Sequence, residues 1–158
     1  MRRWVSIYLL CLIISGLGAI PVDAQRNLVA FSKAPILIES GGKAHKFTVE
    51  LALSQRQQLQ GLMLRRQMAP DAGMLFVYRR EEPNAMWMKN TFLPLDMLFI
   101  GRDGVVKKIV ERTVPLSEET ITSGGPVVAV LELNAGTASR LGLKPGDKVI
   151  AAALGTGD

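Results

Sequence analysis

The chain has 158 residues, a formal net charge of +5, one histidine and one cysteine. The single cysteine excludes a disulfide within the chain. A conventional zinc site is also excluded, because it needs three or four ligands and the chain has too few histidine and cysteine side chains. The basic residues form dispersed doublets rather than one patch, which argues against a nucleic-acid partner. These doublets are Arg65-Arg66, Arg79-Arg80 and Lys107-Lys108. We therefore expect no metal centre, no cofactor and no nucleic-acid partner.

Residues 1–24 predict a secretory signal peptide. Two arginines near the start precede an apolar run over residues 4–14, and small residues then lead to a cleavage site after Ala24. A run of about 11 residues is shorter than the roughly 20 that a helix needs to cross a bilayer. We expect an exported protein, periplasmic or secreted, with no stable membrane insertion after cleavage, which also removes the only cysteine.

A flexible lead-in is predicted over residues 25–34, followed by a single β-rich domain over residues 35–158. The segment 36–39 predicts a first strand. The sequence Ser40-Gly41-Gly42-Lys43 predicts a hairpin turn, because glycine accepts positive φ angles. Residues 45–53 then alternate between apolar and polar, which is typical of a half-buried strand.

A short helix is predicted after the second strand. Ser54 and Gln57, three residues apart, form a capping box, and Gly61 predicts the end of the helix. We expect about two helical turns that connect two strands. After a loop over residues 65–73, the continuous apolar run 74–78 predicts a central strand.

Further short strands are predicted in the rest of the chain. Strands recur at about ten-residue spacing with turn residues between them, and there is no βαβ alternation. We expect a polar turn at 79–84, a strand at 85–91, a hairpin over 95–110 with its turn at 101–104, a loop at 111–125, a strand at 127–133, one helical turn capped by Thr137 and running to Leu141, and a last strand at 148–153.

These elements predict a mainly β fold. The expected architecture is a compact antiparallel sandwich or partly closed barrel of about eight short strands, with one or two short connecting helices.

The stretch NAMWMKNTFLPLD contains the candidate site. If residues 85–91 form a strand, the period of two places Trp87, Lys89 and Thr91 on one face. An aromatic ring beside an ammonium group and a hydroxyl group suits a sugar, a carboxylate or a peptide. The alternative is a core tryptophan with Lys89 extending to water. Pro94 favours a strand end, where side chains stay accessible.

Three other features bear on the possible chemistry, and the first two leave alternatives open. Of the seven methionines, all but Met1 lie within residues 63–97; they either pack in the core or supply soft sulfur ligands for copper(I). Asp96, Glu111 and Glu132 offer carboxylates for acid–base chemistry if the fold brings them together. His45 has no nucleophile-elbow serine near it, which argues against a Ser-His-Asp triad.

Segments spread along most of the chain resemble a known family. In order, they read GLMLRRQMAPDAGMLFVY, MWMKNTFLPLDMLFI, GVVKKIV, VLELNAG and LGLKPGDKV. They are similar to domain of unknown function 192 (DUF192) over about residues 43–152, although Met86 stands where the family often has an aromatic residue. The resemblance implies a small, mainly β domain that stands behind a signal peptide or membrane anchor in bacteria and has no established activity. The family fingerprint falls on residues 56, 61–63, 73–76, 87–91, 94–96, 136 and 146–147.

Together these patterns give a hypothesis of function. We expect a binding module for a small anionic or carbohydrate-like ligand or a cell-envelope component. One alternative is a hydrolase with Asp96 as base and Lys89 or Asn90 stabilising charge; another is a scaffold or interaction protein with no small-molecule site. The 111–125 loop is expected to cover part of the face that carries Trp87 and Lys89. The uncovered part would form a groove bordered by Trp87, Lys89 and Arg56. The predicted ligand-binding residues are Trp87, Lys89, Asn90, Thr91, Asp96 and Arg56.

Overall fold

The computed structural model describes residues 29–156. The expected signal peptide and its cleavage site lie outside them. No helix of the described part of the chain is long and apolar enough to cross a membrane. The elements are β1 (Ser32–Ser40), β2 (Lys43–Ala52), α2 (Gln55–Gln60), β3 (Ala72–Met86), β4 (Leu95–Ile100), β5 (Val106–Val110), β6 (Ile121–Asn134), α3 (Thr137–Leu141), β7 (Lys148–Ile150) and the 3₁₀ helix η1 (Ala152–Leu154).

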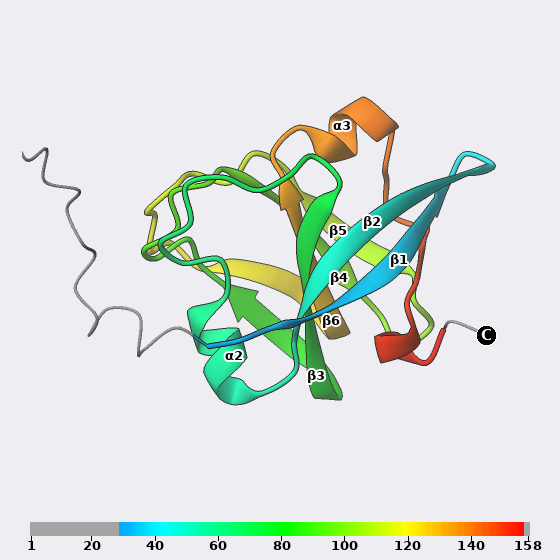
Figure 1. Cartoon of the computed structure of the whole chain (residues 1–158). Helices are drawn as coiled ribbons and strands as arrows, with labels where there is room; N and C mark the ends of the chain where they lie inside the picture. Colours follow the sequence, from blue (N-terminus) through cyan, green and yellow to red (C-terminus); the bar gives the residue numbers. More distant parts are fainter. Residues whose placement is uncertain (1–28, 157–158) are drawn as a thin grey trace, which may run out of the picture.

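The strands form one curled sheet in the order β5-β4-β6-β3-β2-β1-β7. All neighbours are antiparallel except β2 and β3, because the chain between them crosses over through α2. The edge strands approach each other at an isolated bridge between Val105 and Lys148, where the Val106 N–H donates to the Asp147 carbonyl at 2.8 Å. The predicted mainly β fold is therefore confirmed, as a half-barrel of seven strands among the described residues (Figure 1).

Both sides of the sheet are covered by apolar side chains. The inner cluster receives buried residues from all seven strands, as expected for the concave side of a half-barrel. The outer cluster lies on the opposite face and also includes residues of the loops around α2 and after β3. The buried members of the outer cluster are Ala52, Leu62, Met74, Phe76, Met88, Leu93, Leu95, Met97, Phe99, Val127 and Val130.

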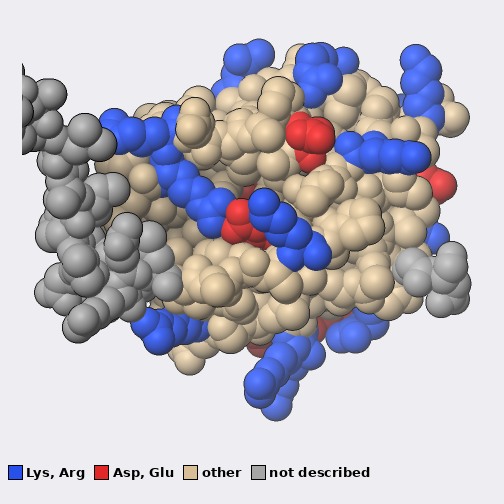
Figure 2. All heavy atoms as spheres, viewed as in Figure 1, with Lys and Arg blue, Asp and Glu red and all other residues tan. Residues whose placement is uncertain are grey.

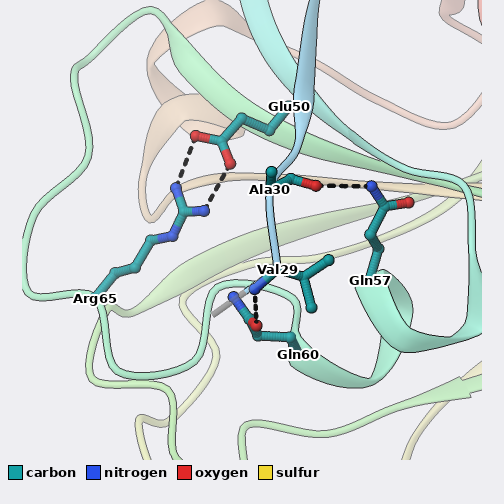
Figure 3. Close-up of polar contacts among 6 residues, drawn as sticks. All are labelled: Val29, Ala30, Glu50, Gln57, Gln60 and Arg65. Carbon is teal, nitrogen blue, oxygen red and sulfur yellow. Dashed lines mark hydrogen bonds and ion pairs between the residues drawn. The ribbon is translucent and has the colours of Figure 1, made fainter. Parts of the chain in front are cut away.

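The predicted capping box fixes the start of α2. The Gln57 N–H donates to Ser54 Oγ at 3.3 Å, and Gln57 Oε1 accepts from the Ser54 N–H at 2.9 Å. The same side chain reaches the chain before β1, because its Nε2 donates to the Ala30 carbonyl at 2.9 Å (Figure 3). Gln60 Oε1 accepts from the Val29 N–H at 2.7 Å. The lead-in segment thus lies along α2 from Val29 onward.

A bidentate ion pair joins the loop after α2 to the sheet. Arg65 Nη1 and Nη2 donate to the two carboxylate oxygens of Glu50 at 2.8 and 2.6 Å (Figure 3). These hydrogen bonds hold the pKa of the Glu50 carboxyl below its usual value.

On the face shown in Figure 2, Lys and Arg side chains are spread out rather than gathered into one patch.

The structure differs most from the prediction between residues 79 and 91. Residues 79–84 do not form a turn, because β3 continues to Met86 as a ribbon paired with the first half of β6. Register shifts between Val77 and Glu82 and between Pro83 and Ala85 interrupt this pairing. The predicted strand 85–91 was therefore wrong beyond Met86, and Trp87 to Pro94 form a loop.

Smaller differences occur at the C-terminal end. The helical turn α3 is present, but its N-cap is Gly136 at φ 82°, with no side-chain cap from Thr137. The last strand ends at Ile150 rather than at residue 153, because η1 follows it.

The contacts of Gln57 predict its contribution to stability. Gln57→Ala removes the acceptor for the Leu53 and Ser54 N–H groups and the donor to Ala30, so we expect a loss of about 1–2 kcal/mol in the free energy of unfolding. Urea denaturation measures this loss. Gln55→Ala is the control, because Gln55 lies in the same helix and its side chain makes no hydrogen bond to any described residue. Equal losses for the two variants would contradict the assignment.

Candidate functional site

A pocket of about 290 Å³ lies between α2 and the outer face of the sheet. It opens to solvent at its rim, where Leu59 and Trp87 are 64% and 46% exposed. Its floor is formed by β3 and β6, and its wall by α2 and the turn that follows. The lining residues are Gln55, Gln58, Leu59, Gln60, Gly61, Leu62, Met63, Phe76, Tyr78, Asn84, Ala85, Met86, Trp87, Thr91 and Glu132.

Gly61 allows α2 to lie close to this floor. It has φ 48°, a left-handed value that favours glycine. A Cβ atom built at Gly61 would lie 3.1 Å from Phe76 Cζ, which is tighter than an ordinary van der Waals contact. A larger residue here would push α2 away from β3 and change the shape of the pocket.

Glu132 supplies the carboxyl group of the pocket floor. It lies in β6, directly opposite Met74 of β3 and Met97 of β4. Only 4% of the residue is exposed, and its carboxyl makes no hydrogen bond or ion pair with any residue between 29 and 156. Burial among apolar neighbours disfavours the charged form and raises the pKa of Glu132 to about 8. At neutral pH the carboxyl is therefore mostly protonated.

Tyr78 lies close to Glu132 in the same pocket. Burial, and next the negative charge of Glu132, raise the pKa of the Tyr78 hydroxyl well above its usual value, so the hydroxyl stays protonated. It donates to Met86 Sδ at 3.4 Å. The pocket thus combines a phenol, a buried carboxyl group and several side-chain amides.

Two of the predicted ligand-binding residues, Trp87 and Thr91, line this pocket. Lys89 lies beside it: its Nζ is 5.2 Å from the Trp87 ring centroid and 3.4 Å from Glu118 Oε2, outside the pocket lining. Asn90 is exposed in a left-handed conformation at φ 54°, and its carbonyl accepts from the Leu64 N–H at 2.8 Å. Arg56 is exposed on α2 and does not line the pocket. The groove therefore has a different border from the expected one.

Asp96, the remaining predicted site residue, has a structural role. It is fully buried on the inner face. Its Oδ1 accepts from the N–H groups of Arg112 at 2.9 Å and Gly136 at 3.1 Å, and its Oδ2 accepts from that of Ala138 at 2.8 Å. The carboxylate thus caps α3 and holds the chain after β5.

The three carboxylates considered for acid–base chemistry do not meet. Asp96 is opposite Leu133 and Met97 is opposite Glu132, so strand alternation directs Asp96 and Glu132 to opposite faces of the sheet. Glu111 is exposed beyond β5. Asp96 also lines no part of the pocket, so the geometry gives no support to a hydrolase that uses Asp96 as its base.

The methionines pack mainly in the outer cluster. Met74, Met88 and Met97 are fully buried there, and Met88 Sδ accepts from Thr113 Oγ1 at 3.2 Å. Because β3 ends at Met86, Met86 and Met88 do not share one strand face, which was the premise for a copper(I) pair. Within residues 29–156 no group of three or more His, Cys, Asp or Glu side chains is arranged to hold a metal ion.

Four polar residues of the pocket were not predicted from the sequence as members of one site: Gln58, Tyr78, Asn84 and Glu132. For Glu132 a signal was present: it is the single charged residue in the run Val127 to Leu133, which reads as a buried strand. A charge in such a strand is rare unless it is paired or functional. Tyr78 offered no comparable signal, because it ends an apolar run that predicts an ordinary strand. Asn84 offered none because residues 79–84 were expected to form a turn.

The family comparison agrees with the resemblance seen in the sequence. The model of DUF192, described as an uncharacterized ACR, matches residues 36–151. Its fingerprint residues 61–63, 76, 87 and 91 line the pocket, and Glu132 lies in the segment VLELNAG. None of the curated proteins matches the chain.

Two crystal structures are similar to this chain. A protein from Sinorhizobium meliloti 1021, whose name proposes a transcription regulator, is 53% identical, with 80% of this chain and 98% of that chain covered and a TM-score of 0.78. A protein of unknown function from Novosphingobium aromaticivorans DSM 12444 is 40% identical, with 74% of this chain and 84% of that chain covered and a TM-score of 0.72.

The hydrogen bonds of Asp96 predict a structural effect of its substitution. Asp96→Asn replaces an acceptor oxygen with a donor and leaves at least one buried N–H group unpaired, so we expect a loss of about 2–3 kcal/mol in the free energy of unfolding. Urea denaturation measures it, with Asp71→Asn as control, because the exposed Asp71 side chain makes no hydrogen bond to described residues. An unchanged stability of Asp96→Asn would contradict the assigned role.

The buried carboxyl of Glu132 predicts a pH dependence of stability. Its pKa is about 8 in the folded protein against 4.5 for an unperturbed group, so the folded state binds the proton more tightly and the contribution is lost as pH rises from about 4.5 to about 8. Glu132→Gln removes this loss. The stability of the variant relative to the natural protein should therefore rise by about 1.4 kcal/mol per pH unit between pH 5 and 7.5.

Urea denaturation at pH 5, 6, 7 and 8 measures this difference. Glu118→Gln, at an exposed carboxylate, should follow the natural protein. Parallel pH profiles for Glu132→Gln and the natural protein would show that Glu132 titrates in the ordinary range.

Proposed function

Because the chain belongs to the DUF192 family, which is described only as uncharacterized, we propose its function from the geometry of the pocket. The protein is an exported binding module, and a small polar ligand of carbohydrate-like chemistry binds in the pocket between α2 and the sheet. Export rests on the signal-like residues 1–24. The ligand class rests on the side chains that line the pocket.

The observation that carries the proposal is the presence in one pocket of Trp87 and a buried carboxyl that has no partner among residues 29–156. An exposed indole ring offers a flat apolar surface for the C–H face of a sugar ring, and polar groups at the floor can bond its hydroxyls. Gln58 Nε2 already donates to the Val77 carbonyl at 2.8 Å, which orients its amide oxygen. A protonated Glu132 both donates and accepts.

An anionic ligand, the other class considered, receives less support. Among the described residues, Glu132 is the only acidic or basic side chain of the Asp, Glu, Lys or Arg type that lines the pocket, and neither Lys89 nor Arg56 does. An anion would meet a carboxyl group and no basic side chain, and ionisation of Glu132 would repel it. The proposal therefore keeps the carbohydrate-like branch of the expectation and drops the anionic one.

A ligand screen on the purified protein tests the proposal. Neutral monosaccharides, disaccharides and cell-wall glycan fragments are compared by thermal shift, and we expect at least one class to raise the melting temperature. In the protein processed after Ala24, Trp87 is the sole tryptophan, so the same ligand should change its fluorescence.

Two variants localise the binding. Trp87→Ala should weaken it about tenfold, or ~1.4 kcal/mol. Phe92→Ala should not, because Phe92 is an exposed aromatic residue of the same loop that does not line the pocket. A flat response to all neutral classes, with unchanged Trp87 fluorescence, would contradict the proposed function.

A further inference from the structure

We infer that the ligand of this pocket carries a small organic ammonium group, which pairs with the carboxylate of Glu132. This inference rests on the proposed function and narrows its ligand class from polar molecules in general to organic cations. An amino-substituted carbohydrate-like molecule satisfies both statements.

The first support is that Glu132 has no partner of opposite charge among residues 29–156. The residue is 96% buried, since 4% is exposed, and it lines the pocket from the floor. Its strand neighbours are Met74 and Met97. Unpaired buried carboxyl groups are rare in folded proteins because a buried charge is costly without a counterion. A cation entering the pocket would supply a counterion for the ionised form of Glu132.

The second support is the aromatic and thioether character of the side chains in the pocket walls. Phe76, Tyr78 and Trp87 contribute aromatic rings, and Met63 and Met86 contribute thioethers. Aromatic faces attract organic cations, and this attraction is strongest for tryptophan.

The third support is the arrangement of charges around the pocket. On β3 the titratable group near Glu132 is Tyr78, which stays neutral. Lys89 pairs with Glu118, and Arg56 on α2 is exposed; neither residue lines the pocket. No Lys or Arg among the lining residues would repel an incoming cation.

Binding of an ammonium group must then release a proton. At neutral pH Glu132 is mostly protonated, since its pKa is about 8. The step is the exchange of the carboxyl proton for the cation: the neutral acid and the ammonium ligand give the carboxylate–ammonium pair and one proton to solvent. The affinity for a cation should therefore rise with pH, by about tenfold from pH 6 to 7 and about fivefold from pH 7 to 8.

Isothermal titration of the purified protein with choline and with ethanolamine tests the inference. The matched probe for choline is 3,3-dimethylbutan-1-ol, which has nearly the same shape with carbon in place of the charged nitrogen. We expect at least one cation to bind at pH 8, at least tenfold more tightly than the neutral alcohol, and to weaken as pH falls to 6. The neutral alcohol should show no such rise with pH.

Two variants assign the effect to Glu132. Glu132→Gln keeps the shape of the side chain without its charge, so the preference for choline over the alcohol should fall at least tenfold and the pH dependence should vanish. Glu118→Gln removes an exposed carboxylate beside Lys89. This variant should keep the preference for choline over the alcohol and the pH dependence of the affinity.

The outcomes separate this inference from the proposed function. If neutral sugars bind but neither cation does, or if cation affinity falls as pH rises, the inference is wrong and the binding function stands. If neither neutral sugars nor cations bind, both are wrong.

Discussion

Both faces of the sheet are buried where β4 and β6 lie side by side, and this constraint decides the environment of every polar side chain there. All residues of β4 and residues 127–133 of β6 are buried. Strand alternation then sends Asp96 to the inner face and Glu132 to the outer face. The inner carboxylate is satisfied by three backbone N–H groups. The outer one has no such partners among the described residues and faces a pocket instead.

The difference between these two carboxyl groups connects the fold to the proposed function. A group that is fully hydrogen-bonded stabilises the fold but has no capacity left for a ligand. An unpartnered buried group costs stability, and a protein retains such a cost most readily where the group serves a site. The outer cluster therefore has two roles: it covers the sheet with apolar side chains, and at Glu132 it forms a low-dielectric pocket floor.

Local signals in the sequence were sufficient for much of the fold. The alternation in β2, the capping box of α2 and the hairpin of β4 and β5 depend on residues close in the chain, and all three are present. The segment 79–84 misled because its polar residues suggested a turn. Its backbone is instead held extended by long-range pairing with residues 121–127 of β6. The side chains of this ribbon are polar because the ribbon is exposed to solvent.

The candidate site was predictable only in part for the same reason. Trp87 and Thr91, which were predicted from their chemistry, line the pocket. The face assigned to them assumed a strand, however, and Asn90 adopts a left-handed conformation in a loop. The position of Glu132 opposite α2 arises from the crossover between β2 and β3 and from the pairing of β6 with both of its neighbours. Neither is encoded in a short window of sequence.

The proposed function depends most on the Glu132 carboxyl, which should be neutral at pH 7 because it is buried without a partner in the part of the chain that the structure describes. A carbon-13 NMR titration of the side-chain carboxyl groups, with the Glu132 signal assigned from its absence in Glu132→Gln, measures this directly. We expect a midpoint near pH 8 for this signal. A midpoint near the unperturbed value of about 4.5 would contradict it, because the carboxyl would then be hydrated or paired and the pocket would lack its buried acid.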